Sequence, residues 1–270
     1  MGLRGTKAIK TGSIHHFPVR FVEFSPLGRY LLLSSGQRVE LRGELCFSLQ
    51  GRGCTGTFVE GQYVPCESTA TPHCERCEPV NYCTMCRGEC LKLRKDCLME
   101  HSVYLALFTP DLVKVGVTRS SRLDDRLREQ GADRGAVLAT FPDGERARQE
   151  EQRVSQCIPG SISADSKVAG LTLTPNVRVW WEVLRSFGVS RDMALEYFPE
   201  PLWMRPIPLV VRTGTTITGR VVGLKGQVLV LEKFNTLYAL NCPSLLGYEV
   251  GFAPGPVNLQ ASLRAFTSEV

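Results

Sequence analysis

The distribution of cysteine constrains this chain more than any other feature. Nine of the eleven cysteines fall between residues 46 and 97. This block contains two CxxC pairs, Cys74/Cys77 and Cys83/Cys86. A CxxC sequence brings two thiolates onto one tight turn, where both can bind a tetrahedral Zn²⁺ at about 2.3 Å. The block therefore predicts a small module that folds around metal ions.

Zinc is favoured over disulfides by the rest of the chain. The first twenty residues contain no apolar stretch that could act as a secretion signal. No segment approaches the roughly 18 apolar residues that a membrane helix needs. We therefore expect a cytoplasmic protein with no membrane partner, in which thiols stay reduced. An iron–sulfur cluster is the alternative metal group.

The spacing of the cysteines favours two structural zinc ions. Only five residues separate the two CxxC pairs, so one ion bound by both pairs is conceivable but would be cramped. The first expected ligand set is Cys54, Cys66, Cys74 and Cys77. The second is Cys83, Cys86, Cys90 and Cys97, with His101 competing for a place. The remaining cysteines, Cys46, Cys157 and Cys242, are expected to be structural.

Positive charge is concentrated near the N-terminus. Residues 1–52 contain eight Lys or Arg side chains and three acidic ones, a difference equal to the net charge of +5 of the whole chain. A partner with a phosphate backbone would suit this segment, because basic groups near phosphates release condensed counterions. A solvated basic surface explains the same charges, so charge alone does not identify the partner.

Short β-strands are expected at both ends of the chain. In residues 19–45, apolar and polar side chains alternate between turn residues, which predicts an antiparallel meander of three or four strands. In residues 215–240, apolar runs are interrupted by glycines, which indicates bent strands in a small barrel. We therefore expect an N-terminal β region over 1–52 and a C-terminal barrel-like domain over 201–270.

Between these ends, the pattern predicts a cysteine-rich module over 53–101 and an α/β domain over 102–200. The second begins with two strands, Val103–Phe108 and Leu112–Thr118, joined by a turn at Pro110. A helix capped by Ser121 and ended by Gly131 should follow. A third strand and a helix opened by Asp143 complete a β-β-α-β-α order. The fold class is therefore α+β.

The remainder of this domain is expected to contain a loop and two helices. The Ser/Gly-rich stretch 159–170 favours a mobile connection. Helices are expected over 177–188 and after Ser190. Trp180 and Trp181 are adjacent on the first of these, and we expect at least one of the two rings to pack in the core.

Several of these residues carry a resemblance to known families. The segment from Cys54 to Glu151 is similar to an uncharacterised family of prokaryotic zinc-binding proteins, and its β-β-α-β-α part resembles a divergent GIY-YIG nuclease domain. The resemblance covers about a hundred residues. The matching residues are Cys97, His101 to Ala106, Lys114 to Arg119, Arg126, Gln130 to Ala132 and Glu151.

The GIY-YIG resemblance implies a catalytic site. Tyr104 takes the place of the tyrosine in the first tripeptide, and Arg126 that of the arginine that holds the scissile phosphate. Glu151 takes the place of the carboxylate that binds one divalent metal, Mg²⁺ or Mn²⁺, and Glu150 is the alternative. The chemistry is coherent, because a guanidinium suits phosphate oxygens and a carboxylate suits Mg²⁺. Beside them, Gly116, Thr118 and Arg119 are expected to contact nucleic acid.

One departure from the family pattern concerns the second tripeptide. Lys114 stands where the family has a tyrosine, and a lysine acts as a base only if its pKa is lowered. Three functions follow as hypotheses. The first is a zinc-stabilised protein that binds nucleic acid and cleaves phosphodiesters. The second is a binding adaptor that has lost the chemistry, and the third is a protein-interaction scaffold.

Overall fold

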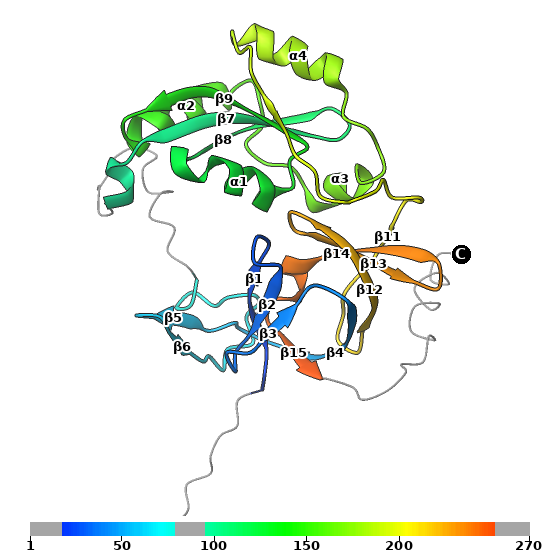
Figure 1. Cartoon of the computed structure of the whole chain (residues 1–270). Helices are drawn as coiled ribbons and strands as arrows, with labels where there is room; N and C mark the ends of the chain where they lie inside the picture. Colours follow the sequence, from blue (N-terminus) through cyan, green and yellow to red (C-terminus); the bar gives the residue numbers. More distant parts are fainter. Residues whose placement is uncertain (1–17, 79–94, 252–270) are drawn as a thin grey trace, which may run out of the picture.

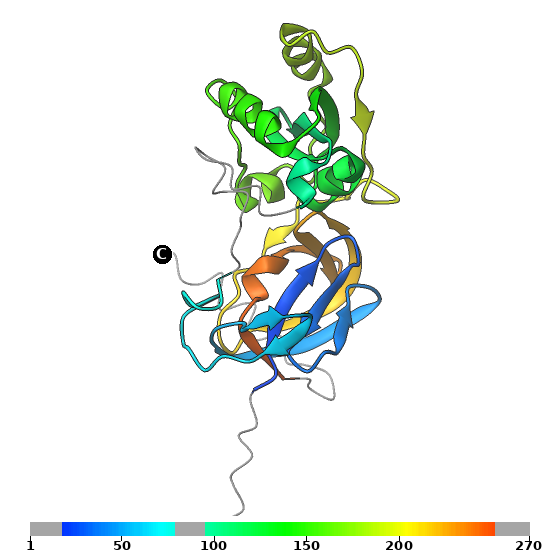
Figure 2. The same ribbon diagram turned by 90° about the vertical axis from the view of Figure 1, so that its left-hand side faces the viewer.

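The computed structural model describes residues 18–78 and 95–251. It is a mixed α+β structure in which two lobes face each other (Figures 1 and 2). The β lobe contains strands from both ends of the chain and carries the cysteine-rich module. The α/β lobe contains residues 101–200. This agrees with the expected α+β class.

A six-stranded sheet forms the β lobe, in the order β11-β14-β13-β12-β4-β15. Its central strands β4 (Glu44–Arg52) and β12 (Thr216–Lys225) are antiparallel, with Phe47 opposite Ile217. On β4, buried side chains alternate with more exposed ones, as period-two patterning requires. The other strands are β11 (Ile207–Pro208), β13 (Val228–Lys233), β14 (Thr236–Asn241) and β15 (Tyr248–Gly251). The two ends of the chain thus share one sheet.

The end strands of this sheet, β11 and β15, do not pair with each other, and β15 is instead bridged to Arg20, so the described strands form no closed barrel. The barrel expected over 201–270 is therefore not formed there. In a C-terminal barrel, β12 would pair on this side with another C-terminal strand. Here β4, from the N-terminal part of the chain, occupies that edge of β12. Sequence patterning marks a strand but does not identify its partner.

The N-terminal meander is present as a second sheet of three strands. These are β1 (Phe21–Ser25), β2 (Tyr30–Leu33) and β3 (Arg38–Glu40), paired in that order. Phe21, Leu31 and Leu33 pack against the six-stranded sheet in one apolar core. A separate hairpin, β5 (Thr57–Val59) and β6 (Gln62–Val64), follows β4 and enters the cysteine-rich module.

The expected β-β-α-β-α order is present in the α/β lobe. Its elements are β7 (His101–Phe108), β8 (Leu112–Arg119), α1 (Leu123–Gln130), β9 (Arg134–Phe141) and α2 (Gly144–Val154). The sheet has the order β10-β9-β7-β8, with β8 as an edge. Side chains of α2 and α4 pack on one face of β7 and side chains of α1 on the other. In Figure 1, α1 therefore lies between the sheet and the β lobe.

The helix ends follow the predicted signals at two positions and depart from them at one. Asp143 caps α2 by accepting a hydrogen bond from the amide of Arg146 at 2.9 Å. Gly131 ends α1 in a left-handed conformation, with φ of 76°. Ser121 caps no helix: it lies in a 3₁₀ turn, Ser120–Arg122, and α1 begins only at Leu123 without a side-chain cap.

The last part of this lobe is more structured than the sequence suggests. The Ser/Gly-rich stretch contains α3 (Ala164–Ala169), capped by the Ser163 hydroxyl. The helix α4 (Val177–Ser186) is present and buries Trp180 completely. No helix follows Ser190; instead β10 (Met193–Ala194) pairs with β9. No helix in the described parts of the chain is both long and apolar enough to cross a membrane.

A close contact joins the two lobes at the end of α1. The backbone of Gly131 approaches that of Gly226, and a side chain at either position would overlap the other segment. Beside it, Lys225 donates to Asp133 at 2.6 Å, and Asp133 also accepts hydrogen bonds from the amide and hydroxyl of Thr109. These contacts fix α1 and the β7–β8 turn against the β lobe.

Neutralising Asp133 should weaken this contact. We expect Asp133→Asn to lower the free energy of unfolding by about 3 kcal/mol, because a largely buried ammonium loses its counter-charge. The Lys225 side chain is only 10% exposed. The matched control is Asp124→Asn, which breaks an exposed pair with Arg128 and should cost less than about 1 kcal/mol. Urea denaturation measures both, and equal losses would contradict this role of Asp133.

Candidate functional site

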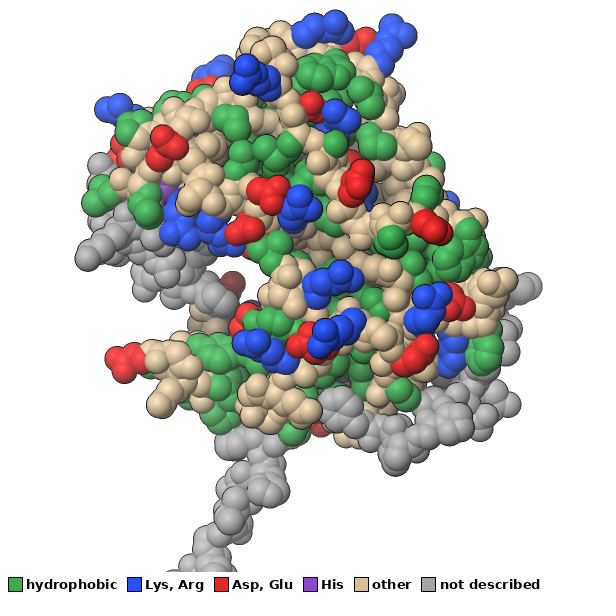
Figure 3. Space-filling model, viewed as in Figure 1, with side chains coloured by type: hydrophobic (Ala, Val, Ile, Leu, Met, Phe, Trp, Pro, Cys, Tyr) green, Lys and Arg blue, Asp and Glu red, His purple; other side chains and the backbone are tan. Residues whose placement is uncertain are grey.

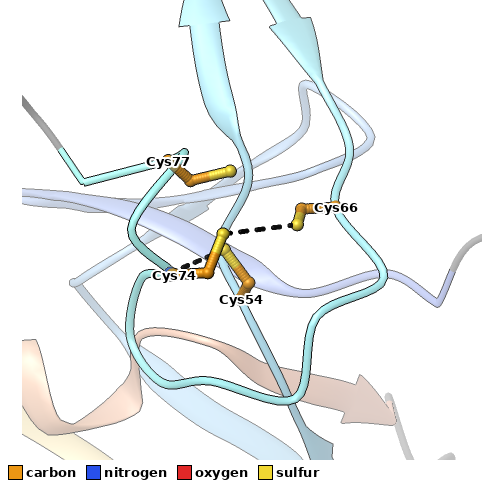
Figure 4. A group of neighbouring side chains, drawn as sticks. All are labelled: Cys54, Cys66, Cys74 and Cys77. Carbon is orange, nitrogen blue, oxygen red and sulfur yellow. Dashed lines mark hydrogen bonds between the residues drawn. The ribbon is translucent and has the colours of Figure 1, made fainter.

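Four cysteines of the β lobe bring their sulfurs together (Figure 4). The Sγ atoms of Cys54, Cys66, Cys74 and Cys77 all lie within 4.8 Å of one another. Cys54 follows β4, Cys66 follows β6, and Cys74 and Cys77 share one turn. These are the four residues that the sequence analysis grouped as the first ligand set. A cluster of this kind could hold a zinc ion.

Backbone amides orient these sulfurs. The amides of Gly56 and Cys74 donate to the Cys54 Sγ at 3.4 and 3.3 Å. The amide of Cys77 donates to the carbonyl of Cys74 at 2.9 Å, which closes the CxxC turn. Gly56 has a φ of 73°, and a Cβ there would lie 2.4 Å from the carbonyl oxygen of Val64. A glycine is therefore required where the chain leaves Cys54.

The pKa values of two neighbouring thiols in the cluster are shifted in opposite directions. Burial and hydrogen bonding to Cys74 raise the pKa of Cys77 to about 12. Burial also acts to raise the pKa of Cys74, but hydrogen bonds from Cys77 and Cys66 outweigh it and lower this pKa to about 6. A bound Zn²⁺ would convert the group to thiolates and release protons.

An arginine anchors the cysteine cluster to the β lobe. Arg20 donates to the carbonyl oxygens of Cys54 and Cys66 at 3.4 and 3.3 Å. It also pairs with Glu249 on β15 at 2.9 Å. The guanidinium thus ties two ligand-bearing loops to the edge of the six-stranded sheet.

The second expected ligand set cannot be assembled from the described residues. Cys83, Cys86 and Cys90 lie outside them. Cys97 lies in a 3₁₀ turn (Lys95–Leu98), and the Nδ1 atom of His101 is 2.7 Å from the carbonyl oxygen of Met99. Of the three cysteines expected to be structural, Cys242 is fully buried, Cys46 is half-buried on β4 and Cys157 is exposed.

Metal analysis tests the cysteine cluster. We expect the purified protein to contain zinc, and both Cys54→Ser and Cys77→Ser to lose one equivalent per chain, because each removes a ligand. Cys157→Ser changes an exposed thiol outside the cluster and should keep all the zinc. Elemental analysis measures the zinc content of the wild-type protein and the three variants. Iron in place of zinc, or a zinc content unchanged by Cys54→Ser, would contradict the assignment.

In the α/β lobe, strand register places the predicted catalytic residues near one another. Tyr104 on β7 lies opposite Gly116 on β8, and Lys114 lies opposite Ala106. Alternation along β8 puts Lys114, Gly116 and Thr118 on the face of the sheet that α1 covers. Arg119 belongs by the same alternation to the other face.

A glycine at position 116 makes room for the tyrosine. A Cβ on Gly116 would lie 2.5 Å from the Tyr104 hydroxyl, so the phenol ring lies across the backbone of β8. The ring is 1% exposed. Its hydroxyl accepts a hydrogen bond from Nε2 of Gln130 at 2.8 Å. Tyr104 is therefore part of the core beneath the site and not an open surface group.

Arg126 and Glu151 approach this tyrosine from two helices. Arg126 lies on α1 and is half exposed, with an ion pair to Glu129 at 3.2 Å. Glu151 lies on α2, beside the edge strand β8, and is 3.7 Å from Arg148. Glu150 pairs with Arg153 at 2.6 Å.

The pKa shifts show that these four groups interact. Burial raises the pKa of Tyr104, Arg126 and Gln130 oppose the shift, and Glu151 adds to it. Burial and the Arg126 charge lower the pKa of Lys114, and Glu151 opposes them. Tyr104 and Lys114 therefore each lie within electrostatic reach of Arg126 and Glu151.

Sequence reasoning missed one cation of this group, Lys167. It lies on α3, and its ammonium is 5.1 Å from the centre of the Phe108 ring on β7. Burial and the charges of Lys114 and Arg126 are the main causes that lower its pKa to about 8. The only signal in the sequence was a lysine within a Ser/Gly-rich stretch, which the pattern assigned to a loop.

A cleft of about 850 Å³ opens between α1 and the cysteine cluster. Arg126 and Glu129 line it on the side of the α/β lobe, and Phe58, His73 and Cys77 on the other side. Figure 3 shows a hollow between the two lobes, with basic and acidic side chains along its upper rim. Arg126 thus borders both this cleft and the Tyr104 site.

Adding a methyl group to Gly116 should disturb the tyrosine. We expect Gly116→Ala to lower the free energy of unfolding by about 1–3 kcal/mol, because the new carbon overlaps a buried hydroxyl. Gly160→Ala adds the same methyl group in open space and should have little effect. Chemical denaturation compares them. Equal stability of the two variants would show that Tyr104 does not lie across this glycine.

A family model described as "Protein of unknown function (DUF2797)" matches residues 36–250. Because the match covers most of the sequence, the chain belongs to this family. No curated protein and no solved structure matches the chain. The matched range runs from the β lobe through the cysteine cluster and the α/β lobe, so it contains both candidate sites.

Proposed function

We propose that this member of the DUF2797 family binds the phosphate backbone of nucleic acid through the α1 face of a GIY-YIG-like α/β lobe. A zinc ion in the Cys54 cluster would stabilise the module beside it. Metal-dependent cleavage at the same site is the second candidate function.

The convergence of Tyr104, Lys114, Arg126 and Glu151 is the observation that supports this proposal. These are the residues that the GIY-YIG resemblance implies as catalytic, and they come from four different elements, β7, β8, α1 and α2. The effects of Arg126 and Glu151 on the pKa of both Tyr104 and Lys114 support this grouping.

The chemistry of the group suits a phosphate. Arg126 can turn part of its guanidinium fork to phosphate oxygens, and Lys114 adds a point charge. Glu151 acts to raise the pKa of Lys114, whereas burial and the charge of Arg126 lower it. A phosphate would reduce the repulsion between the Lys114 and Arg126 charges.

Cleavage is the second candidate because of Glu151. This carboxylate, together with a phosphate and water, could hold one Mg²⁺ beside Arg126. The Tyr104 hydroxyl is buried and its pKa is raised, which argues against Tyr104 taking a proton from the attacking water. Burial of this kind suits a tyrosine that positions its neighbours, and it favours binding as the principal function.

Salt-dependent binding of oligonucleotides tests the principal function. We expect wild-type protein to bind single-stranded or duplex oligonucleotides, with an affinity that falls steeply as salt rises. Arg126→Ala should weaken binding by about tenfold and reduce the salt slope by about one. Arg178→Ala, which removes an exposed arginine of α4, is the control and should change little. An absence of binding at low salt would refute the proposal, and a protein-interaction scaffold would then be the better hypothesis.

Incubation with Mg²⁺ or Mn²⁺ tests the second candidate. If the site cleaves phosphodiesters, Glu151→Gln should abolish cleavage and leave binding intact. Glu150→Gln should cleave normally, because Glu150 pairs with Arg153 on the exposed side of α2. Wild-type protein that leaves DNA and RNA intact with both metals would exclude cleavage and keep the binding function.

A further inference from the structure

We infer that Lys167 completes a phosphate-binding subsite with Lys114 and Arg126, beneath the sheet of the α/β lobe. The inference rests on the proposed nucleic-acid binding and adds a third cation from a helix outside the β-β-α-β-α unit. The ligand would be one phosphate group of the bound strand.

The packing of α3 fixes the position of Lys167. Val168 and Leu171 are buried against β13 and β14 of the β lobe. Gly170 lies against the carbonyl of Thr109, where a Cβ would be only 2.3 Å from the oxygen. The helix is therefore held between the β7–β8 turn and the β lobe, and it does not behave as a mobile loop. Lys167 projects from this fixed helix over the Phe108 ring.

The strands bring the partners of Lys167 to the same place. Tyr104, Ala106 and Phe108 occupy every second position of β7, so their side chains lie on the same face of the sheet. Lys114 lies opposite Ala106 on β8. Lys167 is thus placed above the row of side chains that leads from Phe108 towards Tyr104 and Lys114.

The three charged side chains that affect the pKa of Lys167 are all positive. They are Lys114 on β8, Arg126 on α1 and Lys225 on β12. Lys225 forms an ion pair with Asp133, and the exposed Arg126 forms one with the half-buried Glu129. Within the described parts of the chain, Lys167 itself has no ion-pair partner. Lys167 and Lys114 are half-buried and lie within electrostatic reach of Arg126, so an anion in contact with the three cations would stabilise their charges.

The energetic cost of this arrangement indicates a ligand. Half-burying a lysine beside two like charges lowers its pKa, here to about 8, because the charged form is disfavoured by burial and repulsion. The negative charge of a phosphate in contact with the three cations would offset both effects. Binding of the anion should therefore raise the pKa of Lys167.

Oligonucleotide binding by Lys167 variants tests the inference. We expect Lys167→Met to weaken binding of a single-stranded oligonucleotide by about tenfold and to reduce the salt slope by about one. Lys167→Arg keeps the charge and should retain most of the affinity. Lys233→Met, at the tip of the β13–β14 hairpin, is the control and should bind as wild type does.

The dependence of affinity on pH provides a second readout. A cation with a pKa of about 8 is fully charged below that pH and loses its charge as the pH rises through it. Wild-type affinity should therefore fall between about pH 7 and 9. In Lys167→Arg the fall should be smaller, because a guanidinium stays charged. A loss of packing alone would not produce this difference.

The outcomes separate this inference from the proposed function. If Arg126→Ala weakens binding and Lys167→Met does not, the subsite is refuted and the binding function remains. If Lys167→Met and Lys167→Arg are equally weak and wild type shows no pH dependence, the charge of Lys167 has no role and the subsite is again refuted. If wild-type protein binds no oligonucleotide, both proposals fail.

Discussion

The pairing of β4 with β12 and β15 is the constraint on which the rest of the structure depends. It joins the two ends of the chain in one sheet, so that everything between Gly53 and Arg205 forms an insertion that leaves and re-enters the β lobe. Cys54 lies two residues beyond β4, directly on this exit. A metal ion bound there would fix the first loop of the insertion, and Arg20 already holds the same loop to β15.

The second requirement is that the α/β lobe lies against the sheet in one orientation. Glycines at 131 and 226 allow two backbones to touch, and the Lys225–Asp133 pair lies beside them. Both contacts involve the chain immediately after α1, and α3 packs on the same side. The docking that stabilises the lobes thus also determines where Arg126 and Lys167 lie relative to Lys114. Structure and candidate function depend on the same few contacts.

Local features of this fold were predictable from sequence, whereas long-range ones were not. The CxxC turn, the cap at Asp143 and the glycine that ends α1 each depend on neighbouring residues, so pattern reasoning found them. The partner of β12 lies some 170 positions away in the chain, and no local pattern specifies it. Ser121 failed as a cap because the chain leaves β8 through a 3₁₀ turn. Lys167 was missed because its role comes from tertiary packing of a six-residue helix with weak periodicity.

The central claim is that cations of the α/β lobe, and not the basic N-terminal segment, receive the phosphates. Nuclear magnetic resonance of lysine and arginine side-chain nitrogens, followed during titration with a short oligothymidylate, tests it most directly. The account predicts that the signals of Lys114, Arg126 and Lys167 shift together and saturate at one concentration. Shifts confined to the arginines of the β lobe, such as Arg29, Arg38 and Arg42, would contradict it.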